Sequence, residues 1–175
     1  MEFELKKLSS DAIPAALEKA KRYRLLNEPG EAESICRDVL AVDPENTTAR
    51  IDLILALSDQ FGRGVAGRFD EARSLVDGLT SGYQRAYYTG LLAERRAKAA
   101  HRKGGIGCGP VTYDWLRKAM AAFEEAEGSR EGDTSSECTE EVAALRWNAC
   151  ARKILNNPDI RPEHADDHPS IQDDY

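Results

Sequence analysis

Apolar residues in the first part of the chain recur every three or four positions, which is the period of an α-helix with one buried face. Within residues 11–27 this stripe consists of Ile13, Ala16, Leu17, Ala20 and Tyr23. A turn follows at Asn27 and Pro29-Gly30, because the residue before a proline avoids the helical region. The stripe resumes over residues 31–42 with Ala32, Ile35, Cys36, Val39 and Leu40. The pattern predicts two antiparallel helices joined by a short turn and ended by residues 43–46.

The same arrangement returns twice further along the chain. Helices are predicted over residues 45–61 and from about residue 69, and again over residues 81–102 and from about residue 112. Glycine-rich insertions, residues 62–67 and 103–110, separate the two helices of these later pairs and are expected to be surface loops. Because one helix pair cannot bury both of its faces, a repeated pair predicts a stacked array.

The spacing of small and large residues within these pairs resembles the tetratricopeptide repeat family. The matching residues are Ala20-x2-Tyr23, Ala32-x3-Cys36-x2-Val39, Pro44 and Ala119-x3-Phe123-x2-Ala126, while the position of the family's early aromatic residue holds Ala16. The resemblance spans residues 11–157. It implies an all-α, tetratricopeptide-like right-handed helical solenoid of about three helix-turn-helix units (11–44, 45–80 and 81–128), with the register of the third unit left open.

The two ends of the chain are expected to lie outside the repeats. A stretch rich in serine, glycine and acidic residues, 128–137, precedes a last helix over residues 138–156, on which Ala143, Trp147, Cys150 and Ile154 share a face. A solenoid needs a terminal element to cover its last apolar surface, so this helix is predicted to be a C-terminal cap. Residues 1–10 form a lead segment, and residues 158–175 are expected to be an acidic, flexible tail.

The family resemblance also implies where a partner binds, because the first helices of the units line a concave groove. The matching positions are Leu17, Lys21, Ile51, Leu55, Tyr87 and Leu91, flanked by Arg24, Asp59, Glu94 and Arg95. Only Lys21 suits the carboxylate clamp of the family's best-known subgroup, so an apolar strip for an amphipathic helix or an extended peptide is expected instead. One alternative stays open: the last helix covers the strip and buries Trp147 there.

Charge and composition narrow the classes of partner. The chain has 31 acidic and 24 basic residues, a net charge of −7, which disfavours binding to nucleic acid and to anionic membranes. No apolar run approaches the roughly 20 residues that span a bilayer, and residues 1–10 lack a secretory apolar core. The four cysteines form no C-x-x-C pair, so reduced thiols are expected. A cytoplasmic protein without a cofactor is predicted.

Residues 104–109 offer the most suggestive chemistry, because His101, Arg102 and Lys103 precede a glycine-rich turn that resembles a phosphate cradle. A Walker-type loop, however, places its lysine after the glycines and follows a strand. The expectation is a mobile loop between helices. A nucleotide- or anion-responsive regulator or enzyme that uses this loop remains the alternative to a protein-binding role.

The other candidate groups lack a convincing context. His164 and His168 have metal-ligand character but lie in the predicted tail, so no metal site is expected. Cys108 and Cys138 are predicted to be accessible loop thiols without a base to activate them. Glu124 and Glu125, like Glu140 and Glu141, point in different directions on helices. The sequence therefore predicts a non-enzymatic adaptor or scaffold for a protein or peptide partner, with a self-associating structural array as a second alternative.

Overall fold

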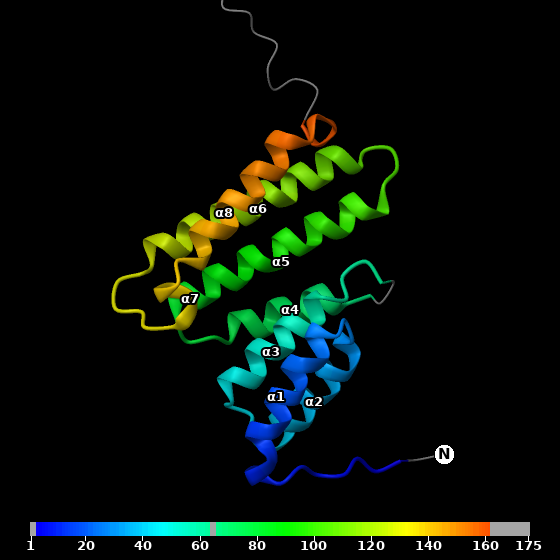
Figure 1. Cartoon of the computed structure of the whole chain (residues 1–175), viewed down its shortest axis with the longest axis vertical. Coiled ribbons are helices and arrows are strands. Elements are labelled where there is room, and N and C mark those ends of the chain that lie inside the picture. Colours follow the sequence, from blue (N-terminus) through cyan, green and yellow to red (C-terminus); the bar gives the residue numbers. More distant parts are fainter. Residues whose placement is uncertain (1–2, 64–65, 162–175) are drawn as a thin grey trace, which may run out of the picture.

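The computed structural model describes residues 3–63 and 66–161, and in that part of the chain every regular element is a helix (Figure 1). The predicted all-α class is therefore confirmed. The elements are η1 (Ser10–Ala12), α1 (Ile13–Leu25), α2 (Pro29–Val42), α3 (Thr47–Ser58), α4 (Arg68–Asp77), α5 (Gly82–Lys103), α6 (Cys108–Gly128), α7 (Ser136–Thr139), α8 (Val142–Asn156) and η2 (Pro158–Ile160).

Helices that are neighbours in sequence are also neighbours in space. Helices α1 to α6 each pack on the next, α6 then packs on α8, and α1 also contacts α3. In Figure 1, α1, α2 and α3 gather at one end of the molecule, α5, α6 and α8 at the other, and α4 lies between these groups. The long pair α5 and α6 makes the most extensive contact. The chain thus builds most of its core from helices that follow one another in sequence, and η2 adds a contact to α6 from the far end of the described chain.

The apolar stripes that the sequence predicts for the first helix pair do form the interior. Ala20, Ala32, Cys36 and Val39 have no exposed surface. One large core continues from α1 to α8, and a smaller cluster of Leu17, Val39 and Ala49 lies beside it. Burial of these small side chains lets α1, α2 and α3 approach closely, which is the packing that the spacing of alanines indicates.

Several helices begin where a local group can satisfy their first free N–H groups. The Asn46 side chain accepts a hydrogen bond from the Ala49 N–H at 2.9 Å before α3, and the Ser81 hydroxyl accepts one from Gln84 before α5. Gly67 and Gly107, both with positive φ, precede α4 and α6. Polar caps and glycines therefore set the bounds of the repeated pairs.

The second half of the chain differs from the prediction at three points. Helix α6 begins at Cys108, earlier than the predicted start near residue 112, so Cys108 and Gly109 are helical. The single helix predicted over 138–156 is broken into α7 and α8 at Glu141, whose φ is 53°. The tail does not begin at residue 158, because η2 follows and Ile160 is fully buried against α6 and α8. Residues 162–175 lie outside the described part of the chain.

Candidate functional site

Three of the four charged residues predicted to flank the groove, Arg24, Asp59 and Arg95, form one connected ion-pair network across three helices. Asp59, at the end of α3, receives Arg24 Nε from α1 at 2.9 Å and also pairs with Arg95 of α5. All three side chains are no more than a quarter exposed. The shared carboxylate of Asp59 thus links α1, α3 and α5, and removing it would leave two partly buried cations without their partner.

A second ion pair extends this surface to the last helix. Glu94 of α5 is 3% exposed and pairs with Lys98 on its own helix and with Arg146 of α8 at 3.3 Å. Burial would lower the pKa of Arg146, but Glu94 and Tyr87 together outweigh burial and raise it. Arg146 also interacts with Tyr87, where it partly opposes the rise that burial causes in the pKa of the phenol. The Arg146 side chain therefore links α8 to α5 at Glu94, one of the residues predicted to flank the groove.

The apolar strip expected in the groove is largely absent from the surface. Leu17, Tyr87 and Leu91 are buried in the core, and only Ile51 and Leu55 are half-buried. Lys21 is exposed and pairs with Glu18 of its own helix. Internal packing has taken up three of the six predicted contact positions, so the exposed part of this face is more charged than the sequence pattern indicates.

Trp147 does not fill the groove as the alternative prediction proposed. Its indole Nε1 donates to Glu124 Oε1 of α6 at 2.8 Å, and its side chain is half-buried. Ala143 and Cys150 occupy the buried stripe of α8 instead. The face of α8 that carries Trp147 is thus turned toward α6, while Arg146 is the residue that reaches the groove.

Burial perturbs the charged groups beneath this face. It raises the pKa of Asp52, and the attraction of Lys21 and Arg24 only partly opposes that effect. Burial also lowers the pKa of Arg24. For Arg95, burial together with repulsion from Arg24 and Arg146 lowers the pKa to about 10, so the guanidinium keeps its charge at neutral pH.

A cavity of about 430 Å³, here called the basic cavity, opens where the end of α3 meets α5 and α8. Six of its eight lining residues carry basic side chains: Arg95, Lys98, His101, Arg102, Arg146 and Lys153. Ser58 and Asp59 complete the wall. His101 Nδ1 is buried there without a hydrogen-bond partner among the described residues. This cavity is not among the sites predicted from the sequence, although Lys98, His101 and Arg102 follow helical spacing on one face of α5.

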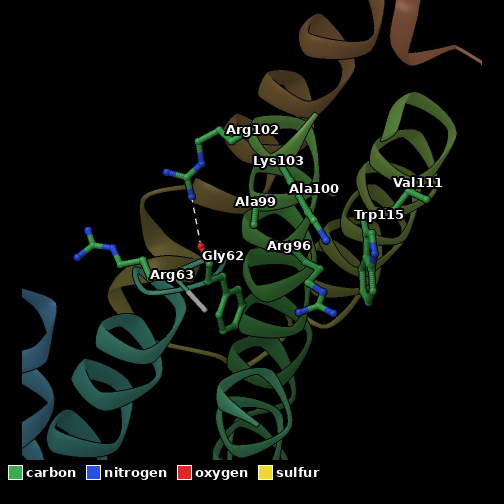
Figure 2. Close-up of a pocket in the computed structure, with 10 residues that line it drawn as sticks. Gly62, Arg63, Arg96, Ala99, Ala100, Arg102, Lys103, Val111 and Trp115 are labelled. Carbon is green, nitrogen blue, oxygen red and sulfur yellow. Dashed lines mark hydrogen bonds between the residues drawn. The ribbon is translucent and has the colours of Figure 1, made fainter. Parts of the chain in front are cut away.

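A larger cavity of about 570 Å³, here called the aromatic cavity, lies on the neighbouring side of α5 (Figure 2). Its wall includes Phe61 and Trp115 together with four cationic side chains. Arg102 borders both cavities. The turn at 104–107, predicted as a possible phosphate cradle, contributes no lining residue to either cavity.

The thiols predicted to be accessible are not equivalent. Cys138 is 4% exposed, so that prediction is wrong for it, whereas Cys108 is half-buried within α6 and not in a loop. Burial raises the pKa of Cys36 and of Cys150 to about 12. Thiols with pKa values this high hold almost no thiolate at neutral pH, which makes them poor nucleophiles.

Within residues 3–63 and 66–161, no three His, Cys, Asp or Glu side chains come together in a way that could hold a metal ion. His164 and His168 lie outside the described residues. None of the described helices combines the length and apolar character that crossing a bilayer requires.

Comparison with protein-family models, with curated proteins and with solved structures finds no match to this chain.

Proposed function

We propose that this chain is a non-enzymatic interaction module, a tetratricopeptide-like solenoid, that binds an acidic segment of another protein. The segment lies along the face formed by α1, α3 and α5 and places its carboxylates at the basic cavity. The observation that carries the proposal is this cavity, because six basic side chains from two helices converge there with one carboxylate in the wall. The sequential packing of helix pairs supports the solenoid part of the proposal.

The sign of the partner's charge follows from the balance of charges at the cavity. Arg95 is compensated by Asp59, and Glu94 is shared by Lys98 and Arg146, but Lys153 forms no ion pair with a described residue. The excess is positive in a chain whose net charge is −7. Such a local reversal of sign attracts acidic partners to one place and repels them elsewhere, which favours specific docking.

Apolar contacts are available beside these charges. Ile51 and Leu55 are half-buried on α3. They precede Asp59, which forms the ion pair with Arg24, by about two helical turns and one helical turn. A helix or extended peptide that carries acidic residues and at least one apolar anchor fits this combination. The expectation of a purely apolar strip is therefore replaced by a mixed surface.

Peptide phage display on the purified protein tests the proposal. Wild type is expected to enrich acidic peptides with an apolar residue, and the double variant Lys98→Glu/Lys153→Glu is expected to lose that enrichment. Lys7→Glu/Lys19→Glu makes the same change of charge at exposed positions of the lead segment and α1 and should retain it. Enrichment of the same peptides on both double variants would contradict the proposal.

The apolar part of the surface has its own test. Synthetic versions of the enriched peptides are titrated against Ile51→Asp and Leu55→Asp variants, with circular dichroism to confirm the fold. We expect the dissociation constant to rise by at least about tenfold, which corresponds to the loss of one buried apolar anchor. Unchanged affinity in folded variants would remove α3 from the binding face.

A further inference from the structure

The aromatic cavity is bounded by three parts of the chain that are distant in sequence. The turn after α3 supplies Phe61, Gly62 and Arg63, the second half of α5 supplies Arg96, Ala99, Ala100, Arg102 and Lys103, and α6 supplies Val111 and Trp115. Figure 2 shows Lys103 pointing along α5 toward Arg96, which faces Trp115. Arg96 and Lys103 are seven residues apart and therefore share a helix face.

Four cations line this cavity and no carboxylate does. Arg63, Arg96, Arg102 and Lys103 form no ion pair with a described residue, whereas Arg24, Arg95 and Arg146 on the neighbouring face are all paired. Two of the four have neutral partners, because Arg63 donates to Asn27 Oδ1 at 2.9 Å and Arg102 donates to the Phe61 carbonyl at 3.3 Å. An anion in the cavity would relieve their mutual repulsion.

The helix dipole at the end of α5 explains only some of the four cations in the aromatic cavity. Cations in the last turn of a helix interact favourably with its dipole, which accounts for Arg102 and Lys103. It does not account for Arg96, which lies two turns earlier, nor for Arg63, which belongs to another segment. Their convergence with the α5 terminus is a tertiary feature and is consistent with a ligand site.

Contacts within the protein position the wall of the aromatic cavity. Phe69 packs on Phe61 and on Trp115, with ring centroids 5.6 and 5.4 Å apart, and the Arg96 guanidinium lies 5.3 Å from the Phe69 centroid. Gly62 has a φ of +86°, and a Cβ there would lie 3.2 Å from the Ala99 Cβ. The turn is thus pressed against α5, and this contact places Arg63 and the Phe61 carbonyl at the rim.

We propose that the aromatic cavity binds a small polyphosphate, either inorganic or carried by a nucleoside. Arginine presents planar forks of N–H donors that match phosphate oxygens, and three arginines with one lysine can neutralise several negative charges. A volume of about 570 Å³ lies in the range of small-molecule sites and exceeds the space that one orthophosphate fills. The site uses side chains of α5 and not the glycine turn that follows it, and of its four cations only Arg102 also borders the basic cavity.

The two tryptophans of the chain provide the measurement. Trp115 lines the aromatic cavity and Trp147 does not, so Trp147→Phe leaves Trp115 as the one tryptophan, which excitation at the red edge separates from the tyrosines. In this background, sodium tripolyphosphate at low ionic strength is expected to give a saturable change of fluorescence below about 1 mM. ATP without metal is titrated as the second probe. Equal affinities show that the phosphates alone are recognised, and tighter binding of ATP shows that the nucleoside also contacts the wall; both results support the site.

Charge-reversal variants show which cavity binds tripolyphosphate. Lys103→Glu is expected to weaken tripolyphosphate binding by at least about tenfold, because it replaces an attraction by a repulsion inside the cavity. Lys19→Glu, an exposed position on α1, should change the dissociation constant by less than about twofold. Lys153→Glu, which alters only the basic cavity, should also have a small effect because of its distance from Trp115.

Three results would overturn the proposal. The first is the absence of saturable fluorescence and of binding heat in calorimetry with the folded wild-type protein. The second is equal affinity of the Lys103→Glu and Lys19→Glu variants. The third is loss of binding in Lys153→Glu but not in Lys103→Glu, which would assign the anion to the basic cavity instead.

Discussion

The backbone of Asp159, in η2, packs directly against Gly109 of α6. A Cβ built on Gly109 would meet the Asp159 carbonyl oxygen at a separation that real Cβ atoms essentially never show, and Cα of Ile160 would lie 3.5 Å away. The neighbouring atoms belong to the backbone, so they cannot move aside as a flexible side chain can. This glycine therefore lets η2 dock on α6 and bury Ile160.

Gly109→Ala is predicted to destabilise the protein by about 1–3 kcal/mol, the usual cost of an added methyl group in a closely packed site. Urea denaturation measures the free energy of unfolding, and hydrogen exchange of the Ile160 amide, which donates to the Asn157 carbonyl, reports whether η2 detaches. Gly128→Ala in the same helix is the control, because no atom lies within 4 Å of its Cβ position. A smaller loss for Gly109→Ala than for Gly128→Ala would exclude the docking role.

Asp52 makes stability depend on pH. Its carboxylate is 4% exposed, Oδ2 lacks a hydrogen-bond partner among the described residues, and burial raises its pKa above the ordinary value of 3.8. Between 3.8 and the raised pKa the folded state binds more protons than the unfolded state, so stability falls as pH rises through this window. Asp52→Asn is therefore predicted to raise the Tm at pH 7 by a few degrees, with the difference shrinking toward pH 4.

Thermal unfolding of wild type and Asp52→Asn across this pH range measures the effect. Asp114→Asn, at an exposed position on α6, is the matched control and should change the Tm at pH 7 by less than Asp52→Asn does. A lower Tm for Asp52→Asn at pH 7 would mean that the attraction of Lys21 and Arg24 outweighs burial, contrary to the expectation.

Arg146 is predicted to contribute to stability through Glu94. Arg146→Ala leaves the buried carboxylate with Lys98 alone, and because the Arg146 side chain is 37% exposed we expect a loss of about 1–2 kcal/mol. Arg152→Ala, an exposed position on the same helix, should change stability by less than about 0.5 kcal/mol. Urea denaturation compares the two variants.

A double-mutant cycle separates the ion pair from other effects of the substitution. Glu94→Gln removes the charge that Arg146 compensates, so Arg146→Ala should cost less in that background than in wild type. Equal costs in both backgrounds would show that Arg146 acts by packing on Tyr87 and not through the carboxylate.

The helices and their buried faces follow from local information. The spacing of Ala20, Ala32 and Cys36 predicts a stripe, and all three residues are fully buried. Turns also follow from local information. Proline restricts φ and glycine allows positive φ in any surroundings, as Pro29 and Gly67 do here. The all-α class and the approximate bounds of most helices were therefore accessible from the sequence.

Tertiary structure decided the properties of the surfaces. Arg24 and Asp59 are 35 residues apart, and nothing in either helix alone specifies that they pair. Gly109 looks like part of a flexible loop until η2 packs on it, and the apolar strip expected in the groove is reduced because Tyr87 and Leu91 join the core. Helical periodicity records which face of each helix is apolar, but the meeting of charges, cavities and close backbone contacts depends on how those faces are placed against one another. The sequence by itself determined the helices, and packing between them determined the ion-pair network and both cationic cavities.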